Sequence, residues 1–279
     1  PDPRSRPGVQ GSAPGNLLKR TVMTPAELRA LVTANKFDKP TAGFCPGYVQ
    51  ANLAGFPSVY AEDFASFCRA NPKPCPLLEI IGPGNTLSQH LAPGADIKDT
   101  ISRYHIWLDG ECAETVPSLH GIDTTDVVFF LLGCSFSFEE ALVDAGIHLR
   151  HLDEHKNVAM YRTSIPLVPK GVFQGTMVVS MRPIATHRVE DAVAITGRYP
   201  DVHGAPVHIG TPAEIGIADI TRPDYGEYVE IHEGETPVFW ACGVTPQQVI
   251  QRARLPLAVS HVPGYMFISD RKNSSYAVC

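Results

Sequence analysis

The most distinctive hydrophobic pattern in the chain lies between residues 126 and 146. Apolar residues run without a break over Val127–Leu132, and Gly133, Cys134 and Ser135 follow. A short continuous apolar run is typical of an element buried on both faces. Ser137 then stands three residues before a glutamate, which is the spacing of a capping box at a helix start. The stretch therefore predicts buried backbone that leads directly into a helix N-terminus.

A second stretch repeats this pattern near the C-terminus. The apolar run that begins at Pro237 ends in Cys242 and Gly243, and Thr245 then precedes a proline suited to the first helical position. Free N–H groups and the positive end of a helix dipole favour a carboxylate or a developing oxyanion. We therefore predict that the two junctions form two walls of one pocket. Taken singly, each pattern also fits a buried element that turns into a surface helix around a glycine.

Capping signals, proline positions and β-branched content predict the other elements. Helices are expected from Thr24, over Tyr60–Ala70 and over Thr186–Arg198. Strands are expected at Pro76–Ile81, Arg103–Leu108, Glu111–Val116, Met160–Val168 and Gly175–Ile184. Glu79 lies inside an apolar strand, so its carboxylate must be exposed, paired with a partner, or a functional acid with a raised pKa.

Composition excludes several classes of protein. With 279 residues and 44% hydrophobic content the chain can bury a large core, and its net charge of −6 gives no nucleic-acid surface or basic membrane patch. Its longest apolar runs are far shorter than a membrane span. Seven cysteines, odd in number and without CxxC spacing, favour a reducing compartment, namely the cytoplasm or, as an alternative, the mitochondrial matrix. Self-association into a homo-oligomer is left open.

Two polar segments are candidates for ligand contact. The segment Gly43–Leu53 contains Tyr48, Gln50 and Asn52 among glycines and a proline, and it fits either a surface turn or a substrate-facing loop. A later segment carries three histidines. They are His148, His151 and His155. Their spacing allows one helical face, but charged neighbours and the lack of a closed ligand signature favour a solvated polar segment.

Several words of the sequence resemble the D-glutamate cyclase family, whose bacterial members are called hydro-lyases. They are CPGYVQANL (45–53), CPLLE (75–79), APGAD (92–96), LLGCSFSFEEAL (131–142), VVSMRPI (178–184), HGAPVHIG (203–210), PVFWACGVTPQ (237–247) and PGYMFISD (263–270). They are spread from about residue 23 to residue 270. Several of them are long and uncommon.

The resemblance implies an α/β protein with a layered α/β main domain and a smaller α+β subdomain. Residues 23–110 and 190–271 are expected to form the main domain and residues 111–189 the subdomain. Residues 1–22 are expected to be a disordered leader or expression remnant and residues 272–279 a loose tail. For the family's animal mitochondrial member the resemblance implies reversible loss of water from D-glutamate to give 5-oxo-D-proline.

Lactam formation needs a general base for the amine, a general acid for the leaving oxygen and donors for an oxyanion. The candidate acids and bases are His203, His208 and His261, with Glu139 or Glu140 as partner. Each histidine lies near glycine or proline, where an imidazole can reach a cleft. For each one the alternative is a surface position or a structural hydrogen bond.

Arg182, at a predicted strand end, is the candidate anchor for the second carboxylate of the substrate; its alternative is a structural ion pair. Cys134 and Cys242 fit either thiolate nucleophiles at helix N-termini or small buried side chains that allow close packing, and we favour the second. The backbone N–H groups of Ser135, Phe136, Gly243 and Val244 would then bind the substrate, with Thr245 beside them.

These observations lead to three hypotheses. The main one is a hydro-lyase that acts on a small amino or hydroxy dicarboxylate; the family resemblance and the two helix starts suited to carboxylates motivate it. It is expected to be cofactor-independent, because no zinc, P-loop or dinucleotide fingerprint is present. The second is a non-catalytic protein that binds small carboxylates. The third, which is weaker, is a thiol-dependent hydrolase.

Overall fold

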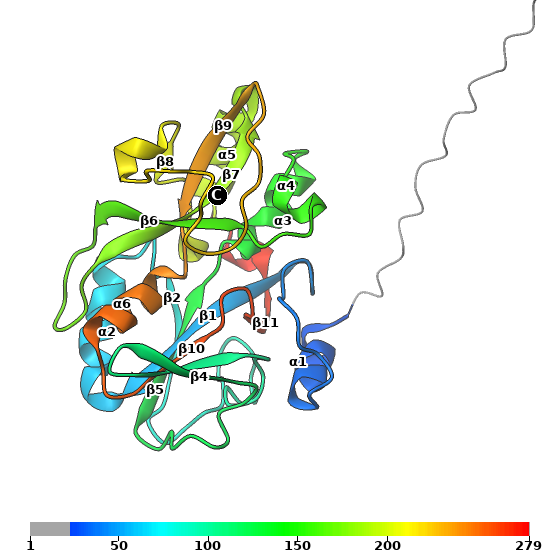
Figure 1. Ribbon diagram of the computed structural model, residues 1–279. Helices are drawn as coiled ribbons and strands as arrows, with labels where there is room; N and C mark the ends of the chain where they lie inside the picture. The colour runs from blue at the N-terminus through cyan, green and yellow to red at the C-terminus, as the bar shows by residue number, and fades with distance from the viewer. Residues whose placement is uncertain (1–22, 279) are drawn as a thin grey trace, which may run out of the picture.

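The computed structural model describes residues 23–278, so the leader predicted at residues 1–22 lies outside the described part. This part of the chain contains a seven-stranded and a four-stranded β-sheet, with helices packed against both (Figure 1). In Figure 1 the seven-stranded sheet occupies the lower half of the molecule and the four-stranded sheet the upper half. The predicted mixed α/β class is therefore confirmed.

The strands are β1 (Tyr48–Pro57), β2 (Leu77–Ile81), β3 (Tyr104–Leu108), β4 (Glu111–Val116), β5 (Val127–Gly133), β6 (Ala159–Pro166), β7 (Thr176–Ala185), β8 (His208–Ile209), β9 (Glu235–Ala241), β10 (Ala258–His261) and β11 (Phe267–Lys272). The α-helices are α1 (Pro25–Thr33), α2 (Ala61–Ala70), α3 (Phe136–Asp144), α4 (Arg150–Asp153), α5 (Val189–Gly197) and α6 (Thr245–Ala253). The 3-10 helices are η1 (Ser58–Tyr60), η2 (Thr186–Arg188), η3 (Pro200–Val202), η4 (Pro212–Ile215) and η5 (Asn273–Tyr276).

All strand pairs in both sheets are antiparallel. The larger sheet has the order β2-β5-β1-β10-β3-β4, with β11 also paired to β1, and the smaller has the order β6-β7-β9-β8. Strands of the larger sheet lie within residues 48–133 and 258–272, and those of the smaller within residues 159–241. The division into domains at residues 111 and 190 stays a prediction. The chain does not pass from one sheet to the other at either position. In the predicted tail, Val278 N donates to Arg198 O at 2.7 Å.

The two sheets contain an internal structural repeat. β1 and β7 each have 10 residues, and each leads directly through a three-residue 3-10 helix (η1 or η2) into an α-helix (α2 or α5). β5 and β9 each have 7 residues, and each leads through a cysteine into a nine-residue helix, α3 or α6. The two junctions singled out in the sequence are therefore corresponding parts of one repeated unit.

The register of the strands follows the same repeat. Ala51 of β1 pairs with the last residue of β5, and Val179 of β7, at the corresponding position, pairs with the last residue of β9. The repeats also exchange strands: β6 follows the helices of the first repeat but pairs with β7, and β10 follows α6 but pairs with β1. Each sheet is therefore completed by the other half of the chain.

The principal core lies between the two sheets. Buried residues from both sheets and from α2 meet in it, including Phe56, Phe64, Phe130, Met181 and Phe239. Because side chains alternate across a strand, the neighbours of Met181 and Phe239 point to the opposite face of the smaller sheet, where Trp240 and Ile184 pack with α3 and α5. This second face carries the candidate site.

Glu79 has a structural role. Its carboxylate accepts hydrogen bonds from Ser88 Oγ (2.8 Å) and from the backbone N–H groups of Gln89, His90 and Leu91. Burial by itself would raise the pKa of Glu79, but these four donors lower it below its usual value. The side chain therefore fixes the position of the loop that follows β2. Of the alternatives given for Glu79, this is the carboxylate paired with a structural partner.

Four helix starts fit capping boxes in the sequence, at Thr24, Ser137, Thr211 and Thr245, and the one at Thr24 is confirmed. The side chains of Thr24 and Glu27 cap α1 reciprocally, with Pro25 at its first position. The other three predicted boxes are wrong, because α3, α6 and the 3-10 helix η4 have no side-chain cap. None of the helices between residues 23 and 278 has the length and apolar character that crossing a membrane requires.

Candidate functional site

The two cysteine-glycine junctions are neighbours in space. Asn52 Nδ2, from the middle of β1, donates to Gly133 O at 2.7 Å, and a Cβ atom placed on Gly243 would lie 2.0 Å from this same nitrogen. Only glycine permits so close an approach. Asn52 therefore fills the space between the two junctions and holds them together.

The hydroxyl groups that were expected to cap the helices connect each helix to the facing strand instead. Ser137 Oγ accepts from Gln50 N at 3.2 Å, and Thr245 Oγ1 accepts from Val178 N at 3.0 Å. Gln50 and Val178 occupy the same position in β1 and β7. The two bonds are therefore equivalent in the two repeats, and the hydroxyls are structural because each satisfies a buried backbone donor.

A buried charged cluster lies beside the first junction. Arg182 Nε and Nη2 donate to Glu139 Oε1 at 3.0 and 2.5 Å, and His151 Nε2 lies 3.1 Å from the same oxygen. The guanidinium also lies 5.4 Å from the ring centroids of Phe138 and Trp240. Burial by itself would raise the pKa of Glu139, but Arg182 and His151 bring it down to about 2. The carboxylate is therefore ionised at neutral pH.

Arg182 has no unused nitrogen for a substrate. In addition to its two bonds to Glu139, it donates through Nη1 to Ser180 Oγ (3.0 Å) and through Nη2 to Ser135 Oγ (3.1 Å), and its side chain is fully buried. Of the two readings of Arg182 from the sequence, these contacts match the structural ion pair. Ser135 is likewise engaged in this network.

His151 is the residue that sequence reasoning missed. It was placed in a solvated polar segment, which is wrong for this side chain, because only 1% of His151 is exposed. Ile147, Leu149 and His151 are buried in alternation, and that period of two was a signal in the sequence. Besides its contact with Glu139, the imidazole has a buried Nδ1 atom without a hydrogen-bond partner in the described chain.

A half-enclosed pocket of about 650 Å³ opens beside His151. It is lined by the loop before β1, from Lys39 to Phe44, by the segment His151–Asn157 and by Glu227. His155, which also lines it, has a left-handed backbone (φ 53°), as is common for the residue just after the C-cap of a helix, here α4. The volume lies within the range of small-molecule sites.

Gln50 holds the loop that forms one wall of this pocket. Gln50 Oε1 accepts from Thr41 Oγ1 at 2.7 Å, and Gln50 Nε2 donates to Thr41 O and Phe44 O. Thr41 N in turn donates to Gly264 O at 2.8 Å. The polar groups that the sequence suggested for ligand contact, Gln50 and Asn52, are thus used within the protein to position backbone.

Two of the three candidate histidines are buried apart from the pocket. His203 Nδ1 lies 2.7 Å from Lys73 O, and His261 Nδ1 accepts from Leu53 N at 3.0 Å. Burial lowers the pKa of each to about 4, so both are neutral at pH 7. The bonds of His261 match its structural reading; His203 keeps a buried Nε2 atom without a partner in the described chain but does not line the pocket.

His208, the third candidate, is paired with Phe239 in β9 and lies on the core side of the smaller sheet, opposite to the face of Arg182. Its Nε2 lies 2.8 Å from Thr211 O. Two other candidates point elsewhere: Glu140 accepts from Asn273 Nδ2 at 3.2 Å, and the ring of Tyr48 lies 3.6 Å from Lys272 Nζ. None of these three lines the pocket beside His151.

The two thiols are poor nucleophiles. Burial raises the pKa of Cys242 to about 11 and raises that of Cys134 further, in spite of the N–H groups of Val244 and Phe136 that donate to them. Both thiols are therefore protonated at neutral pH, as expected for small buried side chains. Two of the four backbone donors predicted for an oxyanion, those of Phe136 and Val244, are used by these sulfur atoms.

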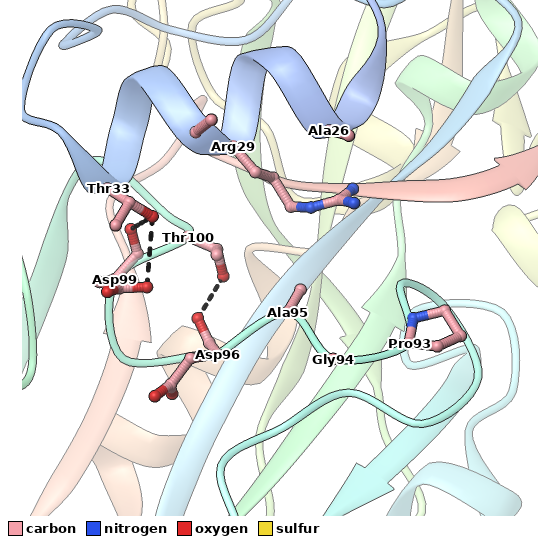
Figure 2. Close-up of a pocket in the computed structure, with 10 residues that line it drawn as sticks. Ala26, Arg29, Thr33, Pro93, Gly94, Ala95, Asp96, Asp99 and Thr100 are labelled. Atoms are coloured by element: carbon pink, nitrogen blue, oxygen red, sulfur yellow. Dashed lines mark hydrogen bonds between the residues drawn. The ribbon is translucent and has the colours of Figure 1, made fainter.

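A second hollow, of about 390 Å³, lies between α1 and the loop Pro93–Thr100 (Figure 2). Its charged groups have protein partners: Arg29 pairs with Asp270 at 2.9 Å, and Asp99 accepts from Thr33 Oγ1. Figure 2 shows the Thr33–Asp99 contact and the bond from Thr100 to the backbone of Asp96. Because these groups are satisfied, the pocket beside His151 is the stronger candidate.

The described chain thus combines a mixed α/β fold with a buried carboxylate–imidazole pair, Glu139 and His151, beside a pocket of small-molecule size. Residues 128–270 match the family model described as D-glutamate cyclase. The chain belongs to the D-glutamate cyclase family. Its similarity to bacterial relatives extends over most of its length.

Three relatives, each named "Putative hydro-lyase", illustrate this. The protein of Burkholderia ambifaria is 52% identical over 92% of this chain and 100% of its own length. That of Stutzerimonas stutzeri is 49% identical over 94% of this chain and 99% of its own length. That of Corynebacterium urealyticum is 49% identical over 92% of this chain and 97% of its own length.

Among solved structures, the nitrogen repressor-like protein MJ0159 from Methanococcus jannaschii is similar over 90% of this chain and 99% of its own. The TM-score is 0.37 and the identity 12%, which is too low to support any argument.

Proposed function

We propose that this protein is a hydro-lyase that reversibly converts D-glutamate into 5-oxo-D-proline and water in the pocket beside His151. Membership of the D-glutamate cyclase family and the hydro-lyase names of the relatives support the reaction class. One observation carries the choice of site: a buried ion pair orients an imidazole that lines a pocket and has a nitrogen without a partner.

The reaction requires two protons to move between nitrogen and oxygen. The α-ammonium group of D-glutamate loses one proton, its lone pair forms a bond to the side-chain carboxyl carbon, and the resulting nitrogen loses a second proton. One carboxyl oxygen accepts both protons and leaves as water when its bond to carbon breaks. A single group that alternates between base and acid can carry these protons in turn.

His151 is suited to that role through its partner Glu139. The ionised carboxylate accepts a hydrogen bond from Nε2–H, which leaves Nδ1 as the ring nitrogen that can take up and return a proton. Once Nδ1 has taken a proton, the nearby carboxylate stabilises the imidazolium, as in carboxylate–histidine pairs of other enzymes. Arg182 keeps the carboxylate ionised throughout and is therefore a positioning residue.

The direct test is incubation of the purified protein with D-glutamate or 5-oxo-D-proline, followed by chiral chromatography. Conversion should be seen in both directions, and His151→Gln should lower kcat by about 100-fold or more, the usual contribution of a general acid–base group. His148→Gln, a change at an exposed histidine of the same segment, is the matched control.

No interconversion at micromolar enzyme would exclude D-glutamate as the substrate. In that case thermal-shift measurements with D-glutamate separate the alternatives, because a small-carboxylate binding protein is stabilised by its ligand without turnover. The cytoplasmic or mitochondrial location and the possibility of a homo-oligomer stay predictions.

A further inference from the structure

We propose that Lys39 and Glu227 bind the α-carboxylate and the nitrogen of the substrate, so that the pocket selects an acidic amino acid over the corresponding hydroxy acid. This inference rests on the proposed function, since it assigns the groups that orient the substrate toward His151. It replaces the sequence-based expectation that Arg182 anchors the non-reacting carboxylate.

The cationic side chains near the pocket differ in how many hydrogen bonds and ion pairs they already form within the protein. Arg182 does not line the pocket, and its three side-chain nitrogens all donate to protein oxygens. Lys156 Nζ donates to Tyr228 O at 3.0 Å and pairs with Glu154 at 2.7 Å. Within residues 23–278, Lys39 takes part in no such bond, and its side chain is exposed at the pocket. Lys39 is therefore the ammonium group best placed to meet a carboxylate.

Glu227 is the one carboxylate among the described residues that line this pocket. Its Oε2 accepts from Asn157 N at 3.2 Å, which fixes the side chain at the pocket while its second oxygen remains without a bond in the described chain. A carboxylate accepts hydrogen bonds and donates none, so it matches the N–H groups of the substrate amine and of the product lactam equally well.

The burial of these groups gives the pocket two different ends. Lys39 and Glu227 are exposed, and His151 is buried. The zwitterionic α-carbon end of the substrate fits the exposed end of the pocket, where Lys39 can pair with its carboxylate and Glu227 with its ammonium group. The side-chain carboxyl group then extends toward the imidazole that exchanges its protons. A hydroxy acid lacks the positive charge that Glu227 attracts, so its binding should be weaker.

The test for Lys39 combines a variant with a modified substrate. Lys39→Met should raise the KM for D-glutamate about tenfold, the typical value of one charge-assisted hydrogen bond, with kcat unchanged. D-glutamate α-amide, which lacks the α-carboxylate, should be a poor substrate for the wild type. Lys39→Met should not raise the KM for this amide further. Lys36→Met is the matched control, because Lys36 is exposed on the preceding segment and does not line the pocket.

The test for Glu227 compares binding of D-glutamate with that of 2-hydroxyglutarate by calorimetry. The wild type should prefer the amino acid, and Glu227→Gln should abolish that preference by weakening D-glutamate alone. Glu230→Gln, at an exposed glutamate outside the pocket, should retain it.

The outcomes distinguish this inference from the proposed function. If D-glutamate is converted normally while Lys39→Met and Glu227→Gln behave like their controls, the inference is wrong and the function stands. If additive losses are found with Lys39→Met and the α-amide, the assignment of the α-carboxylate is also wrong. If the wild type binds D-glutamate without converting it, the proposed function is wrong. The dissociation constants of D-glutamate for Lys39→Met, Glu227→Gln and their controls then test the inference by themselves.

Discussion

Glu139 and Gln247 occupy corresponding positions in the two structural repeats, but only Glu139 faces an arginine. Each follows the cysteine of its junction at the same spacing, and the position of Arg182 in β7 corresponds to Ala54 in β1. Gln247 instead donates through Nε2 to His261 O at 2.8 Å. A buried carboxylate is costly without a cation, so an amide suits the half that has Ala54. The repeat therefore contains one charged site and one neutral counterpart.

Replacement of Glu139 should cost stability as well as activity. Glu139→Gln leaves the buried guanidinium of Arg182 without its counter-charge, and we expect the free energy of unfolding to fall by about 3–5 kcal/mol. Urea unfolding followed by circular dichroism measures this. Glu140→Gln, next in the sequence but half-buried beside Asn273, should change the value by less than about 1 kcal/mol. Equal effects of the two variants would contradict the assignment of the ion pair.

The buried histidines predict a loss of stability in mild acid. His203 and His261 have pKa values of about 4 in the folded protein, lowered by burial from 6.5. Between these two pH values the unfolded chain binds more protons than the folded chain. The free energy of unfolding therefore has its full value above pH 6.5 and decreases as the pH falls toward 4. Glu139, with a pKa of about 2 against 4.5, adds a further loss below pH 4.5.

Urea unfolding at pH 7.5, 5.5 and 4.5 tests the predicted loss of stability. The first value lies above the range from pH 6.5 to pH 4 in which the loss is expected, and the other two lie within it. His261→Gln should lower stability at pH 7.5 and show a shallower decrease in acid, because one of the two buried histidines is gone. His148→Gln should keep the wild-type slope, since that side chain is exposed. A stability that stays constant between pH 6.5 and pH 4 would contradict the burial of both imidazoles.

The loop before β1 should affect substrate binding more than chemistry. Thr41→Val removes the hydroxyl that bonds Gln50 Oε1 and accepts from Met266 N, so the wall of the pocket loses its attachment. We expect the KM for D-glutamate to rise and the free energy of unfolding to fall by about 1–3 kcal/mol. Steady-state kinetics and urea unfolding measure the two effects. Thr33→Val, at an exposed position of α1, is the control; a KM unchanged in Thr41→Val would show that the loop does not shape the site.

The thiols should be dispensable for activity. Because burial raises the pKa of both Cys134 and Cys242, neither is expected to act as a nucleophile. The double variant Cys134→Ala, Cys242→Ala should keep the wild-type kcat, and iodoacetamide should not inactivate the wild-type protein at pH 7. Loss of turnover in a double variant that still unfolds cooperatively would support the thiol-dependent hydrolase instead.

Local patterns in the sequence determined the elements and the two junctions. An unbroken apolar run, a cysteine and a glycine were enough to predict a buried element, which is β5, and the start of α3, because burial and backbone freedom are properties of neighbouring residues. The equivalence of the second junction followed from the same pattern. The reading of Ser137 and Thr245 as caps was wrong because the facing strand offered each hydroxyl a buried N–H group, and no local rule describes that strand.

The candidate site was decided by tertiary structure. Glu139, His151 and Arg182 come from α3, α4 and β7, and the packing of the two helices against the smaller sheet brings them together. The sequence suggested Glu139 and Arg182 but had no means to pair them, and it placed His151 in solvent. Whether an ionisable side chain is a solvated group or a buried proton carrier depends on what packs against it, and only the folded chain specifies those neighbours.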